Sequence, residues 1–440
     1  MSRPPPAGRP PGDTTLPPFE PPLSDLSSLS STIQQAISQY ESASTPKEKA
    51  LYLQTIQTTS TKLTRLTTPL PQQFMELNFR PNLNVAVRIA LSMSLFTSLP
   101  LSGSALTPST LAPLTNSTAE FIHRIARVLA SFSILQESLA STGEVAYSHT
   151  AFSRFLTAPP FQSSTQHLFD NMLQAQTNSA GKFYKEHGFK SPDDAKNCAF
   201  TYAHGVKDMG IFDILEKNPE DMKVFNDAMM VTAQFGLKEL VGCYPWKELG
   251  KNEEGVMLVD VGGGKGHVVR ELRNGVEQLR GSGKVILQDM KVVLEGGVVV
   301  DEEVKLMPYD FLKEVQPVRG ANYFFKAIFH DWPDSSCLQI LGNLAPAMTP
   351  TTSNPTPKLL ITDLVLPDHS PPPGLVLRDI NMLLIGGKER SLSQWEALLA
   401  EGGFKIIKMH GQEGMPVEEA PLKVEGKREL GNFDDDDWMC

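Results

Sequence analysis

Cysteine is scarce in this chain, with four among 440 residues. They stand at positions 198, 243, 337 and 440, and no two of them have the C-x-x-C spacing of a zinc or redox site. So sparse a set supports neither a disulfide framework nor a metal site, and we predict no bound metal. Free cysteines are typical of a reducing compartment, so we expect a cytoplasmic location.

Long hydrophobic runs and an excess of positive charge are also missing. No uninterrupted apolar stretch reaches the roughly 18–20 residues that span a bilayer, and the N-terminus has no apolar segment typical of a signal peptide. The formal net charge is -10, which disfavours nucleic acid or an anionic membrane as a partner. We therefore predict no membrane and no nucleic-acid partner.

Proline, in contrast, is abundant at the N-terminus, where residues 1–24 carry repeated Pro-Pro pairs and few aliphatic side chains. We predict a disordered tail there. Apolar residues then recur near helical spacing from Leu26 to Leu66, with an interruption near Thr45-Pro46. This pattern predicts two helices.

The segment 83–99 is strongly apolar, and we predict one helix over it. Two shorter helices and a small β-wing follow, at residues 111–114, 118–135 and 145–147. This order is that of a winged-helix region, which we place at residues 25–163, and it suggests either DNA binding or subunit association. Residues 1–160 hold 11 basic and 9 acidic side chains, too small an excess for phosphate binding, so we expect a dimer interface.

Residues 164–245 connect this region to the rest of the chain, and we read them as helices that line a substrate pocket. Within them, Pro219 suits the first turn of a helix. Phe225 and Met229 lie four residues apart on one face of that helix. They either pack in a core or face the substrate.

The most informative stretch is Met257-Leu-Val-Asp-Val-Gly-Gly-Gly-Lys-Gly-His267. It predicts a buried strand, a sharp glycine turn and a helix, which is the nucleotide-binding opening of an α/β fold. His267 stands where the dinucleotide pattern G-x-G-x-x-G needs a small residue, and the Gly-Lys-Ser/Thr of a phosphate loop is absent. Asp260 would repel a pyrophosphate and suits the ammonium and sulfonium of S-adenosylmethionine. A glycine turn with a purely structural role is the alternative.

From residue 256 onward, strand and helix patterns alternate, which predicts an α/β fold with a doubly wound, mainly parallel sheet. The expected strands are 256–261, 284–288, 304–307, 321–325, 358–365 and 404–408, and the expected helices are 266–280, 335–345 and 391–401. Asp289 closes the second strand and Asp310 follows the third. Because parallel strands end at one edge of a sheet, we expect both acids to join Asp260 around one ligand, Asp289 at the ribose and Asp310 near the adenine.

A histidine follows the fourth strand, within Lys326-Ala-Ile-Phe-His-Asp-Trp-Pro-Asp334. At that edge His330 is placed to act as a general base near neutral pH. Asp363 ends the next strand and Glu389 precedes another helix, and two carboxylates near one imidazole could hold its tautomer. A structural role for this loop is also open, because Asp334 can cap the helix that follows.

The chain contains Leu258-Val-Asp-Val-Gly-Gly-Gly-Lys-Gly-His267, Leu287-Gln-Asp289, Phe329-His-Asp-Trp-Pro-Asp334 and Gly386-Gly-Lys-Glu-Arg-Ser391. In order and approximate spacing these motifs resemble the plant and fungal S-adenosylmethionine-dependent O-methyltransferases, which methylate caffeic acid, flavonoids and fungal polyketides. The resemblance covers about residues 80–410. It implies a Rossmann-like methyltransferase domain, here residues 246–440, after a helical, winged-helix-like dimerisation domain, and hence a homodimer.

The resemblance also implies roles for single residues. His330 matches the catalytic base, and Asp363 and Glu389 match its flanking acids. The expected cofactor contacts are Asp260, Gly262, Gly264, Asp289, Asp310, Phe311 and Lys326, and the expected substrate contacts are Phe225, Met229 and Trp332. The chain departs from the family at Met290-Lys291, where Leu-Pro is common, and at Asp363, where glutamate is more common. The shorter side chain at 363 puts its reach to His330 in question.

We therefore predict an enzyme that transfers a methyl group from S-adenosylmethionine to a phenolic hydroxyl of a small secondary metabolite or polyketide. His330 is the predicted general base. The alternatives are a catalytically silent family member that acts as a regulatory or scaffolding dimer, a winged-helix DNA-binding protein and a nicotinamide oxidoreductase.

Overall fold

The computed structural model describes residues 20–173, 175–176, 180–234, 240–242, 244–410 and 422–428, and for 230–234 and 422–428 it describes the backbone alone. The chain divides into two compact units, Met1–Val85 and Ala86–Cys440. Most of the predicted tail over 1–24, and the acidic end at 431–440, lie outside the described residues. The first helix begins at Leu23, directly after Pro22, so the predicted tail extends too far at its C-terminal end.

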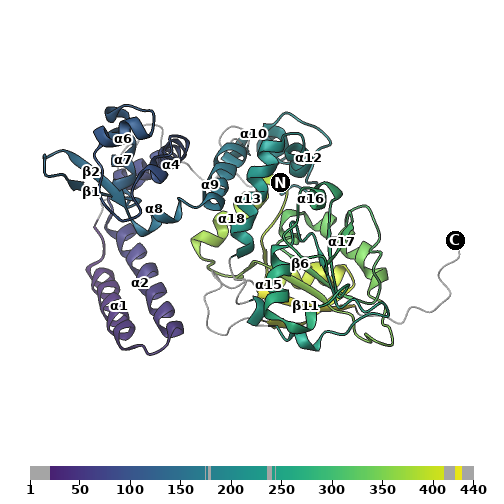
Figure 1. The fold of residues 1–440 in the computed structure, drawn as a ribbon. Coiled ribbons are helices and arrows are strands. Elements are labelled where there is room, and N and C mark those ends of the chain that lie inside the picture. Colours follow the sequence, from purple (N-terminus) through teal and green to yellow (C-terminus); the bar gives the residue numbers. More distant parts are fainter. Residues whose placement is uncertain are drawn as a thin grey trace. The chain divides into compact units, whose positions relative to one another are not determined.

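Three helices lie in the described part of the first unit: α1 Leu23–Ser42, α2 Pro46–Thr67 and α3 Leu70–Phe79. The first two pack against each other as a hairpin (Figure 1). A capping box starts α2, because the Thr45 hydroxyl accepts a hydrogen bond from the Glu48 amide at 3.2 Å and the Glu48 carboxylate accepts one from the Thr45 amide at 3.0 Å. With Pro46 in the first turn, these contacts confirm the break predicted near Thr45-Pro46.

The apolar segment 83–99 forms two helices where one was predicted, α4 Pro81–Ser92 and α5 Leu95–Ser98. Ser94 between them has a φ of 57°, a left-handed conformation that ends a right-handed helix. The turn buries Leu95 and Phe96 almost completely. The prediction of one continuous helix was wrong because burial of these two side chains outweighs the helical pattern of the sequence.

The predicted winged-helix order is present as α6 Pro108–Leu114, α7 Ala119–Ser131, and the antiparallel strands β1 Leu135–Leu139 and β2 Val145–His149. The helix predicted to reach residue 135 stops at 131 because Ser133 adopts a φ of 56° and turns the chain into β1. His123 of α7 lies 2.9 Å from the Tyr147 hydroxyl of β2, measured from Nδ1. This contact turns His123 toward the wing.

Short helices occupy the segment predicted to be helical. They are α8 Ala151–Phe155, α9 Pro159–His167, the π-helix η1 Leu168–Met172, α10 Ala180–Glu186, α11 Ala199–Ala203, α12 Ile211–Glu216 and α13 Pro219–Gln234. A later helix, α18 Pro373–Ile385, joins them, since Leu384 and Ile385 are buried in one cluster with Met172 and Phe200. Figure 1 shows α18 beside α13, whose Phe225 packs against the same cluster. Among all helices of the described residues, none has the length and apolar character required to cross a membrane.

Seven strands form one sheet in the order β10-β11-β7-β6-β3-β4-β5. They are β3 Leu258–Val261, β4 Val285–Asp289, β5 Lys305–Pro308, β6 Asn322–Lys326, β7 Leu359–Asp363, β10 Phe404–His410 and β11 Leu422–Arg428. The five strands from β7 to β5 are parallel, whereas β11 runs antiparallel to both β7 and β10. All six predicted strands are confirmed. The seventh, β11, was missed because it lies beyond the part of the chain that carries the family motifs.

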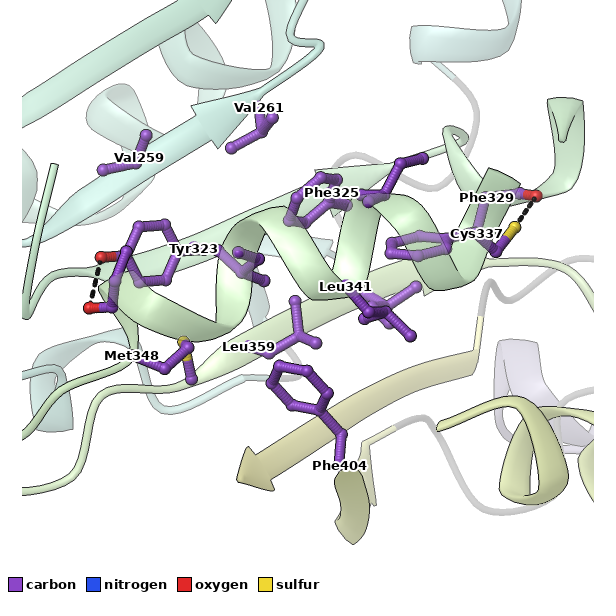
Figure 2. Close-up of a cluster of buried hydrophobic side chains, with 14 of the residues drawn as sticks. Val259, Val261, Tyr323, Phe325, Phe329, Cys337, Leu341, Met348, Leu359 and Phe404 are labelled. Carbon is purple, nitrogen blue, oxygen red and sulfur yellow. Dashed lines mark hydrogen bonds between the residues drawn. The ribbon is translucent and has the colours of Figure 1, made fainter. Parts of the chain in front are cut away.

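Helices cover both faces of this sheet, as a doubly wound fold requires. On one face, Leu258 of β3 is buried with side chains of α15 His267–Gly275. On the other, Val259 is buried with side chains of α17 Asp334–Leu344 and α19 Leu392–Glu401, as Figure 2 shows for α17. The chain first winds from β3 to β4 and β5 and then returns to β6 on the other side of β3. In such folds a ligand binds at this switch point, at the carboxyl ends of β3 and β6.

Candidate active site

The glycine turn follows β3 at the switch point. Gly262 has a φ of 72°, a left-handed conformation that favours glycine, and a Cβ there would lie 2.5 Å from the end of the Ile328 side chain, which would have to move. Gly264 has a φ of 59°, and no heavy atom lies within 4 Å of the position where its Cβ would be. The backbone at Gly264 is therefore open for the close approach of a ligand.

Two of the predicted acids lie at this turn. Asp289, at the end of β4, accepts hydrogen bonds from the amides of Gly264 at 2.8 Å and Met290 at 2.7 Å, and burial raises its pKa. Asp260 is 2% exposed, and its Oδ2 has no hydrogen-bond partner among the described residues. Burial, followed by the charge of Asp289, raises the pKa of Asp260 to about 7, against the opposing charge of Lys326. The turn is thus an electronegative site that favours a cationic ligand.

The third acid is oriented differently. The Asp310 carboxylate accepts from the Lys313 ammonium at 2.8 Å and the Leu312 amide at 3.1 Å, both on its own segment. Its neighbour Phe311 lies at the turn, since a Cβ on Gly262 would be 3.5 Å from the Phe311 ring. Of the predicted cofactor contacts, Asp260, Asp289 and Phe311 are therefore grouped around the turn. The carboxylate of Asp310 pairs with Lys313 instead.

The catalytic candidates meet beside β6 and β7. His330 lies in a short 3-10 helix, η5 Phe329–Asp331. Its imidazole is 3.0 Å from the Glu389 carboxylate at Nδ1 and 3.6 Å from the Asp331 carboxylate at Nε2. Asp363, the last residue of β7, is 4% exposed, and neither of its carboxylate oxygens has a hydrogen-bond partner among the described residues. These three carboxylates surround one imidazole.

The carboxylates change the protonation of the site. Burial by itself lowers the pKa of His330, but the charges of the three acids outweigh it and raise that pKa to about 10. Burial is also the main reason why the pKa of Asp363 rises to about 7, and Glu389 and Asp331 add to the effect. The shorter Asp363, whose reach the sequence left in question, is therefore close enough to act on His330 through its charge.

Glu389 is placed by a loop that lies directly against the His330 loop. A Cβ on Gly387 would lie 2.2 Å from the His330 carbonyl oxygen, and the Lys388 amide donates to that same oxygen at 2.8 Å. The Glu389 amide donates to Asp379 of α18 at 3.0 Å. Only glycine at position 387 allows the two loops to come close enough for the contact between His330 and Glu389.

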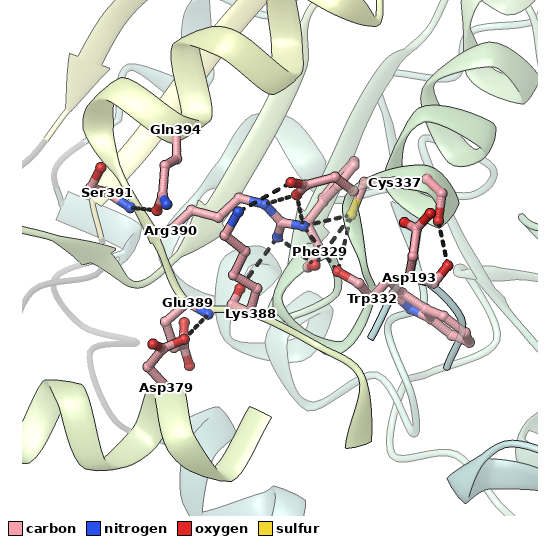
Figure 3. Close-up of polar contacts among 12 residues, drawn as sticks. Asp193, Phe329, Trp332, Cys337, Asp379, Lys388, Glu389, Arg390, Ser391 and Gln394 are labelled. Atoms are coloured by element: carbon pink, nitrogen blue, oxygen red, sulfur yellow. Dashed lines mark hydrogen bonds and ion pairs between the residues drawn. The ribbon is translucent and has the colours of Figure 1, made fainter. Parts of the chain in front are cut away.

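Arg390 fastens these two loops together, and Figure 3 shows its guanidinium at the centre of the contacts. It is 1% exposed and donates to the carbonyl oxygens of Phe329 and Trp332, each at 2.9 Å. It also donates to the Asp334 carboxylate, at 2.6 Å from Nη2. Asp334 is the first residue of α17, and its carboxylate accepts from both Arg390 and Lys388. The predicted capping role of Asp334 was wrong, because its carboxylate is engaged by these two cations.

Known proteins share both parts of the chain. The model of the O-methyltransferase domain matches residues 187–405, and that of the O-methyltransferase dimerisation domain matches residues 76–159. The O-methyltransferase afvC of Aspergillus flavus is 31% identical, over 73% of this chain and 76% of its own. The O-methyltransferase kntB of Aspergillus niger is 32% identical, over 74% of this chain and 77% of its own. The chain belongs to the S-adenosylmethionine-dependent O-methyltransferase family.

Solved structures agree with this O-methyltransferase in fold. OxaC, in a crystal structure with SAH and oxaline, has a TM-score of 0.79 at 22% identity and covers 92% of this chain and 99% of its own. Human N-acetylserotonin methyltransferase, in complex with SAM, has a TM-score of 0.66 at 16% identity, with 82% and 99% covered. The helical N-terminal region and the mainly parallel sheet are thus both parts of the fold that this chain shares with these structures.

An aromatic wall leads from the glycine turn of this O-methyltransferase into its helical region. The rings of Phe311 and Trp332 have centroids 6.0 Å apart, Trp332 and Phe212 are 5.9 Å apart, and Phe212 and Phe225 are 5.8 Å apart. This wall connects the predicted substrate contacts Trp332 and Phe225 with the turn. Met229, one helical turn after Phe225, is 36% exposed.

Several functional candidates escaped the sequence analysis. Asp331 and Arg390 lie inside the quoted motifs next to His330 and Glu389, so the motifs themselves were the signal. Gly387 stands in the same motif, and its need for glycine is visible only once the two loops are placed. Phe212 and Asp379 carry no motif, and nothing in the sequence alone distinguishes them from other residues of their helices.

Proposed function

We propose that this O-methyltransferase methylates a phenolic hydroxyl of a small aromatic metabolite or polyketide, with His330 as the general base. The observation that carries the proposal is the His330 imidazole bound to Glu389 just after the carboxyl end of β6, two residues beyond Ile328, whose side chain lies against Gly262 of the glycine turn. A phenol with a pKa near 10 is mostly protonated at neutral pH, so a base assists its attack.

The residues of the turn fit S-adenosylmethionine. Asp289 would accept from the ribose hydroxyls with its remaining lone pairs, Phe311 would lie against the adenine, and the backbone at Gly264 would approach the ligand. Asp260, with Oδ2 buried beneath the turn, would favour the positive charges of the ligand through its own charge. When bound, S-adenosylmethionine supplies an electrophilic methyl group.

The residues around His330 would move one proton. A carboxylate accepts hydrogen bonds, so Glu389 holds the proton of the imidazole on Nδ1 and leaves Nε2 as the basic atom of the neutral ring. His330 would take the phenolic proton on Nε2. Asp363 and Asp331 would then stabilise the imidazolium by their charge.

The test is His330→Gln, measured with a panel of phenols and a labelled methyl donor under saturating cofactor. We expect kcat to fall by about 10²- to 10⁴-fold with little change in the affinity for S-adenosylmethionine, since the base does not bind the cofactor. The control is His187→Gln, the same substitution at an exposed histidine of the same chain. Near-normal kcat in His330→Gln would refute the general-base role.

We further propose that the enzyme acts as a homodimer. The match to the family's dimerisation domain over residues 76–159 supports this. So does α3, where Phe74, Leu77 and Phe79 are 65%, 77% and 56% exposed, an apolar surface typical of an interface. Light scattering should give about twice the chain mass of 48.4 kDa. A monomer with full activity would contradict the dimer.

A further inference from the structure

A buried polar pair lies away from the catalytic centre, where α9 runs into the π-helix η1. His167, the last residue of α9, is 6% exposed, and Asn171 is 7% exposed. Nδ2 of Asn171 lies 3.2 Å from Nδ1 of His167. Burial of two such polar side chains is costly unless their hydrogen bonds are satisfied, and π-helical turns are concentrated at functional sites.

The pair adjoins the aromatic wall. The His167 ring meets the Phe225 ring edge-on at 5.2 Å. Phe225 in turn contacts Phe212, which contacts Trp332, two residues after His330. The pair therefore lies at the end of the wall that is farthest along these contacts from the catalytic histidine.

The hydrogen-bonding character of the pair follows from its chemistry. Burial lowers the pKa of His167 to about 4, so the ring is neutral at physiological pH. The amide nitrogen of Asn171 can only donate, so Nδ1 of His167 accepts and the ring proton resides on Nε2. Among the described residues no further hydrogen bond reaches Nε2 of His167 or Oδ1 of Asn171. The pair thus presents one N–H donor and one carbonyl acceptor.

We propose that His167 and Asn171 form a recognition subsite for a second polar group of the acceptor, a ring carbonyl or hydroxyl remote from the hydroxyl that is methylated. This inference rests on the proposed function, because it assumes an aromatic acceptor along the wall. A ring carbonyl would accept from Nε2 of His167, and a hydroxyl could also donate to Oδ1 of Asn171. Sites of this kind discriminate strongly against analogues that lack the polar group, because the buried partners are then left unpaired.

The test is calorimetric binding to the full-length protein saturated with S-adenosylhomocysteine. The probes are 5-hydroxy-1-tetralone and 5,6,7,8-tetrahydro-1-naphthol, which share the phenol and differ by one ring carbonyl. We expect the wild-type protein to bind the ketone about tenfold more tightly. In His167→Phe, which keeps a ring of similar size, the two affinities should become equal while that for the tetrahydronaphthol changes by less than about twofold.

Asn171→Leu is a second variant that should reduce the preference for the ketone. It tests the subsite if His167→Phe fails to fold. His187→Phe is the matched control and should keep the preference in full. Equal affinity of the wild-type protein for the two probes, including failure to bind either, would overturn the subsite, as would an unchanged preference in the variants. Methyl transfer is measured separately with the phenol panel, so a protein that prefers the ketone but methylates no phenol would refute the proposed function and keep the subsite.

Discussion

The candidate site has two halves, a cofactor half around the glycine turn with Asp260 and Asp289, and a catalytic half around His330 with Glu389, Asp331 and Asp363. The two halves are built in different ways. In the cofactor half, Asp289 accepts from Gly264, 25 residues earlier, and both belong to one β-α-β unit built from the consecutive elements β3, α15 and β4. In the catalytic half, His330 meets Glu389 across 59 residues, and the contact depends on two loops fastened by Arg390. A half made of consecutive elements is set by local sequence, whereas the other half depends on the packing of segments that are distant in the chain.

The two halves share one electrostatic property. Asp260 and Asp289 lie at the turn with raised pKa values, and three carboxylates surround His330. Buried carboxylates gain stability from a nearby positive charge. A cationic methyl donor between the halves would therefore be favoured by both of them.

The broadest effect, on both stability and kcat, should come from breaking the catalytic half at Arg390. Arg390→Met removes the donors to two loop carbonyl groups and to Asp334, and leaving such groups unpaired costs about 3 kcal/mol of unfolding free energy. We expect kcat to fall by roughly 10²-fold because His330 and Glu389 lose their alignment. Calorimetry should find the affinity for S-adenosylmethionine nearly unchanged.

Arg390→Lys is the matched control, since it keeps the charge and loses the bidentate geometry, and it should give an intermediate kcat. If Arg390→Met weakened cofactor binding as much as it lowered kcat, the two halves would not be separable in this way.

The converse change breaks the cofactor half at Asp289. Asp289→Ala should weaken the affinity for S-adenosylmethionine by roughly 2–4 kcal/mol, or about 30- to 1000-fold, because it removes a charged acceptor for two hydroxyls. At saturating cofactor, kcat should fall much less. Asp310→Ala is the comparison, and its effect should be smaller because the Asp310 carboxylate is paired with Lys313. Unchanged cofactor affinity in Asp289→Ala would contradict the ribose contact.

The last prediction concerns pH, and it sharpens the comparison by testing the catalytic half alone. His330 has a pKa raised to about 10, so below that pH it is mostly protonated and cannot accept a proton. We therefore expect kcat/KM to rise by about tenfold per pH unit from neutral pH upward and to level off near pH 10. Glu389→Gln removes one of the raising charges and should shift the rise to lower pH. A flat profile in the wild-type enzyme would contradict this assignment.

Much of this O-methyltransferase follows from its sequence alone. The six predicted strands, the break at Thr45-Pro46 and the glycine turn were predictable because each depends on neighbouring residues: apolar runs, a capping box and the freedom of glycine. The order of the motifs predicted the family. The motifs also contain His330 and Glu389, which the structure brings together.

Only the tertiary structure decided the rest. The helix over 83–99 breaks at Ser94 because burial of the residues after it outweighs local propensity. Asp334 pairs with Arg390 and Lys388 in place of capping a helix, since two cations from a loop more than 50 residues away reach it. The polar pair of His167 and Asn171 gains its meaning only from the contact of His167 with Phe225, a residue of the aromatic wall. Contacts between distant segments depend on the packing of the whole fold, which no local pattern of residues specifies.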